Sequence, residues 1–277
     1  MSPLPPPGAP ASPPAAPTPA AALQKPGFGL EFRFALIYGA LGTIFVASII
    51  GVVVLARQGG PPTPPPWSTW RPAAGTSLSM TTEIANHVSN QYKLNTSGAP
   101  LLAIVPSAPE GTRGTTVTPV STIGFLSSAT AQSCCARVVD TTNNVQDQLC
   151  GLGARCAITR GVPTAARLRL VRREALELAL YTFKYVPKVN AMIAYIPPQA
   201  GTNHIVLLYL ERSNLQPELD KPISQTLPLT TPPLPTAPDP KEESTIDRLT
   251  KPVEFEFIEF KPIGDGTQAL IISPTTG

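Results

Sequence analysis

Four cysteines lie in one short stretch of the chain, and their spacing limits the chemistry open to them: Cys134, Cys135, Cys150 and Cys156. A structural zinc site needs four thiolate or imidazole ligands, commonly from paired C-x₂₋₄-C sequences. A thioredoxin-like redox centre needs C-x-x-C. Neither spacing is present, so the sequence favours two disulfides with three open connectivities. Zinc and free or partly oxidised thiols stay as alternatives, and we expect no metal and no cofactor.

Arginines that follow the cysteines are a candidate anion-binding group: Arg167, Arg169, Arg172 and Arg173. Guanidinium groups suit bidentate binding of phosphate and carboxylate, so an anionic polymer, lipid headgroup or wall phosphate would fit. The alternative is a solvated helix face on which Arg173 pairs with Glu177. The sequence favours this second interpretation.

The evidence for an enzyme is weak. The chain has only two histidines, His87 and His204, expected on a helix and at the entry to a strand. There is no G-x-S-x-G, P-loop, dinucleotide fingerprint or H-E-x-x-H sequence. A non-catalytic binding or scaffold domain is therefore the prediction. An envelope enzyme that uses His87 or His204 with a free cysteine is the alternative.

The composition argues against nucleic acid as a partner and indicates long linkers. Of 277 residues, 35 are proline, and proline removes a backbone donor, so much of the chain must lie outside regular elements. Charged residues make up 14%, against about 25% in typical soluble domains. The net charge of +3, with no dense basic cluster, argues against nucleic acid.

The N-terminal part of the chain predicts a membrane anchor. Residues 1–33 are rich in proline and alanine and are expected to be a disordered tail. Residues 34–56 contain an apolar run without charge or proline that would reach roughly 33 Å as a helix, enough to span a bilayer. Residues 57–76 read as a proline-rich stalk. We therefore predict a single transmembrane helix.

The orientation rests on the cysteines, because basic residues flanking the apolar run are balanced. Clustered cysteines favour an oxidising compartment. We predict a cell-membrane protein with a cytoplasmic N-terminus and an extracytoplasmic C-terminal domain. Its expected partners are the lipid bilayer and an envelope protein or polymer.

Residues 77–277 have the periodicity of a small α+β domain with a mostly antiparallel sheet and one or two packed helices. The clearest helix follows Thr164, with apolar residues at helical spacing from Leu176 to Phe183. Apolar runs at 189–198, 204–211, 251–260 and 267–273 predict strands in pairs. The stretch at about 213–251 is too proline-rich for a compact connection and predicts an exposed excursion or disordered loop.

The sequence VEFEFIEF at 253–260 breaks strict strand alternation. Phe255 and Phe257 share one face, but Phe260 would fall on the opposite face while Glu259 turned inward. An unpaired buried carboxylate is costly. The pattern therefore predicts either a β-bulge near Phe257 and Ile258 or a sheet covered on both faces at that end.

Overall fold

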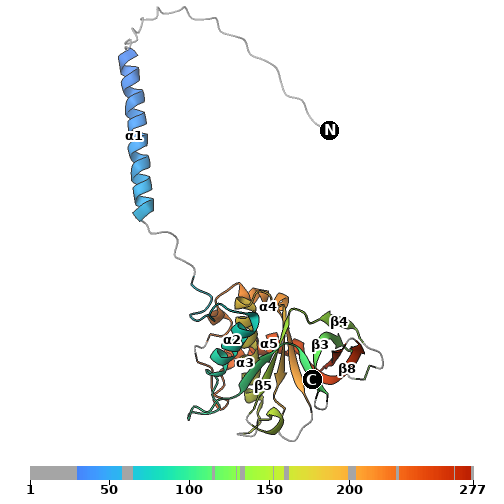
Figure 1. Ribbon diagram of the computed structural model, residues 1–277. Helices are drawn as coiled ribbons and strands as arrows, with labels where there is room; N and C mark the ends of the chain where they lie inside the picture. The colour runs from blue at the N-terminus through green and yellow to red at the C-terminus, as the bar shows by residue number, and fades with distance from the viewer. Residues whose placement is uncertain are drawn as a thin grey trace, which may run out of the picture. The chain divides into compact units, whose positions relative to one another are not determined.

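A computed structural model of the chain shows two units, Met1–Pro64 and Pro65–Gly277 (Figure 1). The structure describes residues 30–57, 65–113, 116–128, 130–131, 135–151, 153–158, 162–198, 204–228, 231–264 and 266–275. The predicted disordered tail lies outside the described residues, apart from 30–33, which begin a helix. Most of the predicted stalk's proline run, 58–64, also lies outside them.

Helix α1 (Leu30–Arg57) occupies the position of the predicted transmembrane helix at 34–56. A helix that crosses a bilayer needs about 20 consecutive apolar residues, and side chains of α1 are described only over 37–53. Among the helices that the structure describes, none is long and apolar enough to cross a membrane. This finding contradicts the predicted span and the single-pass localisation with a cytoplasmic N-terminus and an extracytoplasmic domain.

One sheet runs through the second unit, in the order β1-β5-β6-β7-β8-β9-β3-β2, with β4 beside β3. Its strands are β1 (Ala103–Ser107), β2 (Glu110–Arg113), β3 (Thr116–Phe125), β4 (Arg137–Asp140), β5 (Asn144–Cys150), β6 (Ala191–Ile196), β7 (Val206–Glu211), β8 (Glu254–Gly264) and β9 (Thr267–Pro274). Pairings β5–β6 and β3–β9 are parallel, and the other pairings between these strands are antiparallel.

The sheet is nearly closed because its two end strands are neighbours in sequence. Only residues 108–109 separate β1 from β2, so the ends of the strand order cannot lie far apart. Across this closure the Glu110 backbone N–H donates to Gln146 Oε1 of β5 at 3.3 Å. The second unit therefore combines mixed helices and strands with a barrel-like sheet, which replaces the predicted fold of a transmembrane helix joined to a small domain.

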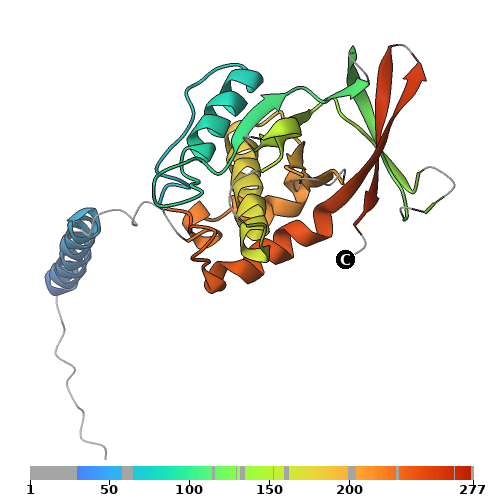
Figure 2. The ribbon, with the colours of Figure 1, turned by 90° about the horizontal axis from the view of Figure 1, so that it is seen from below.

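The helices of the second unit gather on one side of the sheet (Figure 2). They are α2 (Ser77–Ser89), α3 (Ala165–Tyr185), α4 (Arg212–Leu219) and α5 (Pro240–Thr250), with short 3₁₀ turns η1 (Ala154–Cys156), η2 (Ile223–Gln225) and η3 (Lys251–Val253). Helix α3 is the core helix, and Thr164 caps its start by accepting a hydrogen bond from the Arg167 backbone N–H at 3.1 Å.

Strands β6 and β7 form the predicted antiparallel pair and are buried on both faces. Met192 and Leu208 face the core that the helices cover, whereas Ile193 and Leu207 face the inside of the curved sheet. Alternate side chains of a strand point to opposite faces. Coverage of both faces explains why these two strands read as continuous apolar runs.

The predicted β-bulge in β8 is confirmed. The pairing with β9 shifts between Phe257 and Glu259, which leaves Ile258 as the extra residue, 37% exposed. The shift returns Phe260 to the face of Phe257, and the two ring centroids lie 4.9 Å apart. Glu259 therefore stays exposed, at the cost of one exposed isoleucine.

The stretch 213–251, expected to be an exposed excursion or disordered loop, contains α4, η2 and α5. Helix α5 begins with local signals for a helix start. Asp239 Oδ1 accepts from the Lys241 backbone N–H at 2.9 Å, and Pro240 occupies the first turn. Ile246 and Leu249 then bury one face of α5 in the core. The prolines that precede α5 predicted an irregular segment, so these short helix signals were not recognised in the sequence.

Candidate functional site

The candidate cysteines form disulfides in the part of the chain that the structure describes. Cys150, the last residue of β5, is bonded to Cys156 in η1. Cys135 is also disulfide-bonded, and Cys134 lies outside the described residues. Gly151 lets the intervening loop fold tightly, because a Cβ there would lie 2.5 Å from the Ala157 carbonyl oxygen. No cluster of three or more described His, Cys, Asp or Glu residues has the geometry of a metal site.

Replacing both Cys150 and Cys156 with serine is expected to lower the free energy of unfolding by about 2–3 kcal/mol, because the bond closes a short loop in the unfolded chain. Urea denaturation of the second unit measures this change. Reduction of the wild-type protein should cause a loss at least as large, because it also breaks the disulfide of Cys135. An unchanged denaturation midpoint in the double variant would show that the bond does not stabilise the fold.

Three of the four candidate anion-binding arginines are paired with carboxylates from α5 and the start of β8. Arg169 contacts Glu243 at 2.9 Å and Asp247 at 3.2 Å. Arg172 Nη1 lies 3.0 Å from Glu254 and its Nη2 lies 3.7 Å from Asp247. Their positive charges are therefore used to hold α5 against α3. They do not lie on a solvated helix face, and they are not free for an external anion.

Arg173 is the centre of this network and is 1% exposed. Its Nε donates to Glu242 at 2.7 Å, and its Nη1 donates to Glu177 at 3.0 Å and to the Tyr92 hydroxyl. Tyr92 in turn donates to Glu177 at 2.6 Å. Burial opposes the charge of Arg173, but Tyr92 and the two carboxylates outweigh burial and raise the pKa of the guanidinium. The expected Arg173–Glu177 pair is present, but it lies in the interior.

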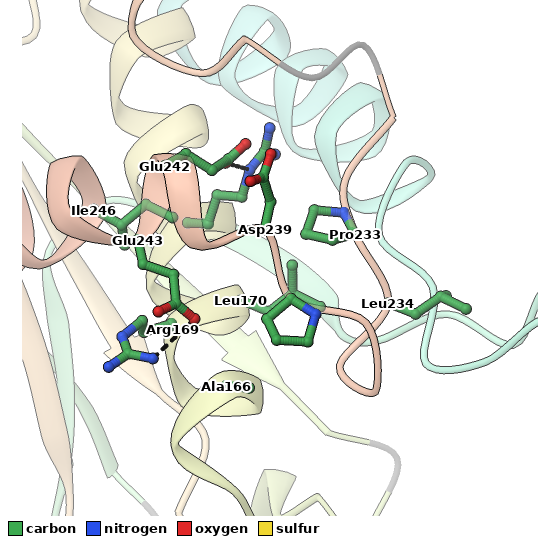
Figure 3. A pocket seen from close by; sticks show the side chains of 11 residues that line it. Ala166, Arg169, Leu170, Pro233, Leu234, Asp239, Glu242, Glu243 and Ile246 are labelled. Carbon is green, nitrogen blue, oxygen red and sulfur yellow. Dashed lines mark hydrogen bonds and ion pairs between the residues drawn. The ribbon is translucent and has the colours of Figure 1, made fainter.

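A small cavity lies between α3, the start of α5 and the proline-rich segment that leads into α5 (Figure 3). Its volume of about 20 Å³ is enough for one water molecule. Arg169 and Arg173 line it, but both are already paired with carboxylates. Glu242 Oε1 is buried there without a hydrogen-bond partner. The cavity is too small, and its cations too well neutralised, for an anionic ligand.

Arg167 differs from the other three arginines. It is 5% exposed, and its Nε and Nη2 atoms are buried without a hydrogen-bond partner. None of the ion pairs described in this structure includes it. Burial lowers the pKa of its guanidinium. Burying a cation without a partner costs free energy, and groups held at such a cost are common at functional sites.

The start of α3 lies at one edge of the sheet with the ends of two parallel strands. Strands β5 and β6 run in the same direction and end at Cys150 and Ile196. Helix α3 connects them, so it runs back across the sheet and begins at the edge where both strands end. The Cys150–Cys156 disulfide holds the connecting loop at the same edge. We call this place the β5–α3 edge.

The two histidines have separate surroundings. His87 on α2 stacks on Trp70 with ring centroids 3.8 Å apart, and burial lowers its pKa against an opposing effect of Glu83. His204 precedes β7, is 75% exposed in its side chain and lies 2.6 Å from Glu256. No free cysteine accompanies them in the described parts of the chain. The structure therefore assembles no histidine–thiol pair from these residues.

Sequence reasoning missed two buried carboxyl groups, Asp147 on β5 and Glu174 on α3. Both oxygens of each are buried without a hydrogen-bond partner. Burial raises the pKa of Asp147 to about 7, and burial followed by the charge of Glu177 raises the pKa of Glu174 well above its usual value. The sequence held a signal for the burial of Asp147, because alternation along a strand places Asp147 on the same face as the apolar Val145.

The comparisons with known proteins give no relative from which a function could be carried over. No family model, no curated protein and no solved structure matches this chain.

Proposed function

We propose that the second unit is a non-catalytic binding domain, and that its ligand or partner binds at the β5–α3 edge. The observation that carries this proposal is the meeting of three features there. The carboxyl ends of parallel β5 and β6, the first turn of α3 and the disulfide-held loop lie together. Folds with parallel strands commonly bind ligands outside the carboxyl ends of those strands.

The disulfide supports this proposal, because binding loops work best when a rigid scaffold holds them. Cys150 ends β5 and Cys156 lies in η1, so the bond fixes the loop directly to the sheet. The three paired arginines of α3 also support the proposal, because they fix the position of this helix. Arg169, Arg172 and Arg173 hold the helix against α5 and the start of β8, which keeps the first turn of α3 in place.

The rival proposal, an enzyme based on His87 or His204 with a free cysteine, gains no support from a specific contact. A general base must lie within hydrogen-bond reach of the group that it deprotonates. Among the described residues, His87 contacts Trp70, Tyr181 and Gln91, and His204 contacts Glu256. These contacts favour structural roles for both histidines.

A fragment screen followed by amide chemical shifts tests the proposal. The probes are a library of small neutral, cationic and anionic fragments added to the second unit, residues 65–277, with its disulfides intact. We expect the shifts to cluster at 149–158, 164–168 and 196–198. A cluster at the α3–α5 cavity or around His87, or shifts scattered over the surface, would contradict the proposed site. Chemical conversion of any fragment would contradict a non-catalytic domain.

A further inference from the structure

We infer that the first turn of α3 binds an oxyanion, a phosphate, sulfate or carboxylate group of the ligand, and that the Arg167 guanidinium contacts it. This inference rests on the proposed function, because it names the ligand chemistry of the same β5–α3 edge. Its two parts, the helix start and the unpaired arginine, are independent observations.

The start of α3 lacks a negative charge that would balance the positive end of its helix dipole. The first backbone N–H groups of a helix lack partners within the helix, and the helix dipole adds a partial positive charge there. Thr164 satisfies the N–H of Arg167, and the Leu168 N–H bonds to the Thr164 carbonyl. No acidic residue lies in the first turn of α3. The N–H groups of Ala165 and Ala166 are therefore the donors that an anion would meet.

Helix α5 in the same unit has a helix start that the chain completes with its own carboxyl groups. Asp239 caps it, and Glu242 and Glu243 lie in its first turn. These carboxyl groups supply the negative charge that the helix dipole favours. The start of α3 has a neutral threonine cap and no carboxylate, so an external anion would complete it in the same way.

Arg167 supplies the second half of the site. Side chains on a helix lean toward its N-terminus, so a long side chain in the first turn extends toward the helix start. Its Nε and Nη2 atoms are buried and have no partner. A planar guanidinium presents parallel donors that match two oxygens of one oxyanion. One bound oxyanion would therefore neutralise this buried cation and accept the α3 N–H groups.

Titration with inorganic phosphate, sulfate and acetate tests this inference on the second unit, residues 65–277. We expect saturable shifts of the Ala165 and Ala166 amides, and at least a ten-fold loss of affinity in Arg167→Gln. Arg167→Lys should fall between the two, because it keeps the charge but loses the planar fork. Lys188→Gln is the matched control, since it removes one positive charge from an exposed turn beyond the other end of α3. It should leave the affinity within two-fold.

Thermal denaturation separates a binding role of Arg167 from a structural one. Arg167→Met replaces an unpaired buried cation with an apolar chain of similar length. Without anion we expect this variant to melt at the same temperature as the wild type or higher. Added phosphate should raise the melting temperature of the wild type only.

Three results would overturn the inference. They are no amide shifts with any of the three anions, equal loss of affinity in Arg167→Gln and Lys188→Gln, and a large fall in melting temperature for Arg167→Met without anion. If neutral or cationic fragments still bind at the β5–α3 edge in that case, the oxyanion inference fails and the proposed binding domain stands. If no fragment binds there either, both fail.

Discussion

Replacing Arg173 with methionine is expected to lower the free energy of unfolding by about 3–5 kcal/mol, because it leaves buried carboxylates without their cation. Glu242 and Glu177 are 2% and 6% exposed, and each lies within 3.0 Å of the Arg173 guanidinium. Methionine keeps much of the aliphatic length, so the loss reports the charge and its hydrogen bonds. Urea denaturation with a constant m-value measures it.

Arg169→Met is the matched control for this prediction. It removes the same charge from the same helix, but its side chain is 27% exposed and its partners are about as exposed. Partly exposed ion pairs contribute about 0.2–1 kcal/mol each, so we expect a loss of about 1 kcal/mol. A loss equal to that of Arg173→Met would mean that burial does not decide the strength of this network.

Asp147→Asn is expected to remove a pH dependence of stability worth about 4 kcal/mol. Burial raises the pKa of Asp147 to about 7 in the folded protein, whereas an unfolded aspartate has a pKa near 3.9. Between these two values the folded state binds more protons than the unfolded state. Stability from this group is therefore complete below about pH 4 and is lost as the pH rises to about 7. The free-energy difference between wild type and variant should follow this course.

Chemical denaturation at intervals from pH 4 to pH 8 measures that difference. Asp140→Asn is the control, because Asp140 is an exposed aspartate on β4 whose pKa is lowered by hydrogen bonds to Thr142. It should leave the slope between pH 5 and pH 8 unchanged. Parallel curves for wild type and Asp147→Asn over the whole range would show that Asp147 does not titrate between pH 4 and pH 8.

Local patterns predicted much of the second unit. The alternation break near Ile258 predicted either a bulge or a sheet covered on both faces, and the structure has the bulge, which keeps Phe260 inside and Glu259 outside. Thr164 marked the cap of the core helix. The apolar runs of β6 and β7 located a buried strand pair. These features depend on near neighbours in sequence, and short-range periodicity is sufficient to find them.

The features that failed depend on contacts distant in sequence. Glu242 lies 69 residues after Arg173, beyond a proline-rich stretch that suggested no packed helix. Without α5 in place, the arginines of α3 look solvated. The same reason hid the difference between Arg167 and the other three candidate arginines, since only the structure shows which of them have carboxylate partners. The closure of the sheet through β1 and β2 was equally out of reach. It depends on the pairing of β1 with β5 and of β3, the hairpin partner of β2, with β9, and both of these pairings join segments distant in sequence.

The most direct test of the central claim is the position of a heavy oxyanion in a crystal of the second unit. Selenate has the shape of sulfate and phosphate, and its anomalous signal locates it without assumptions about the ligand. We predict a selenate within hydrogen-bond distance of the Arg167 guanidinium and of the Ala165 and Ala166 N–H groups. Selenate found only at exposed cations such as Arg248 or Lys251, with the start of α3 empty, would contradict the claim.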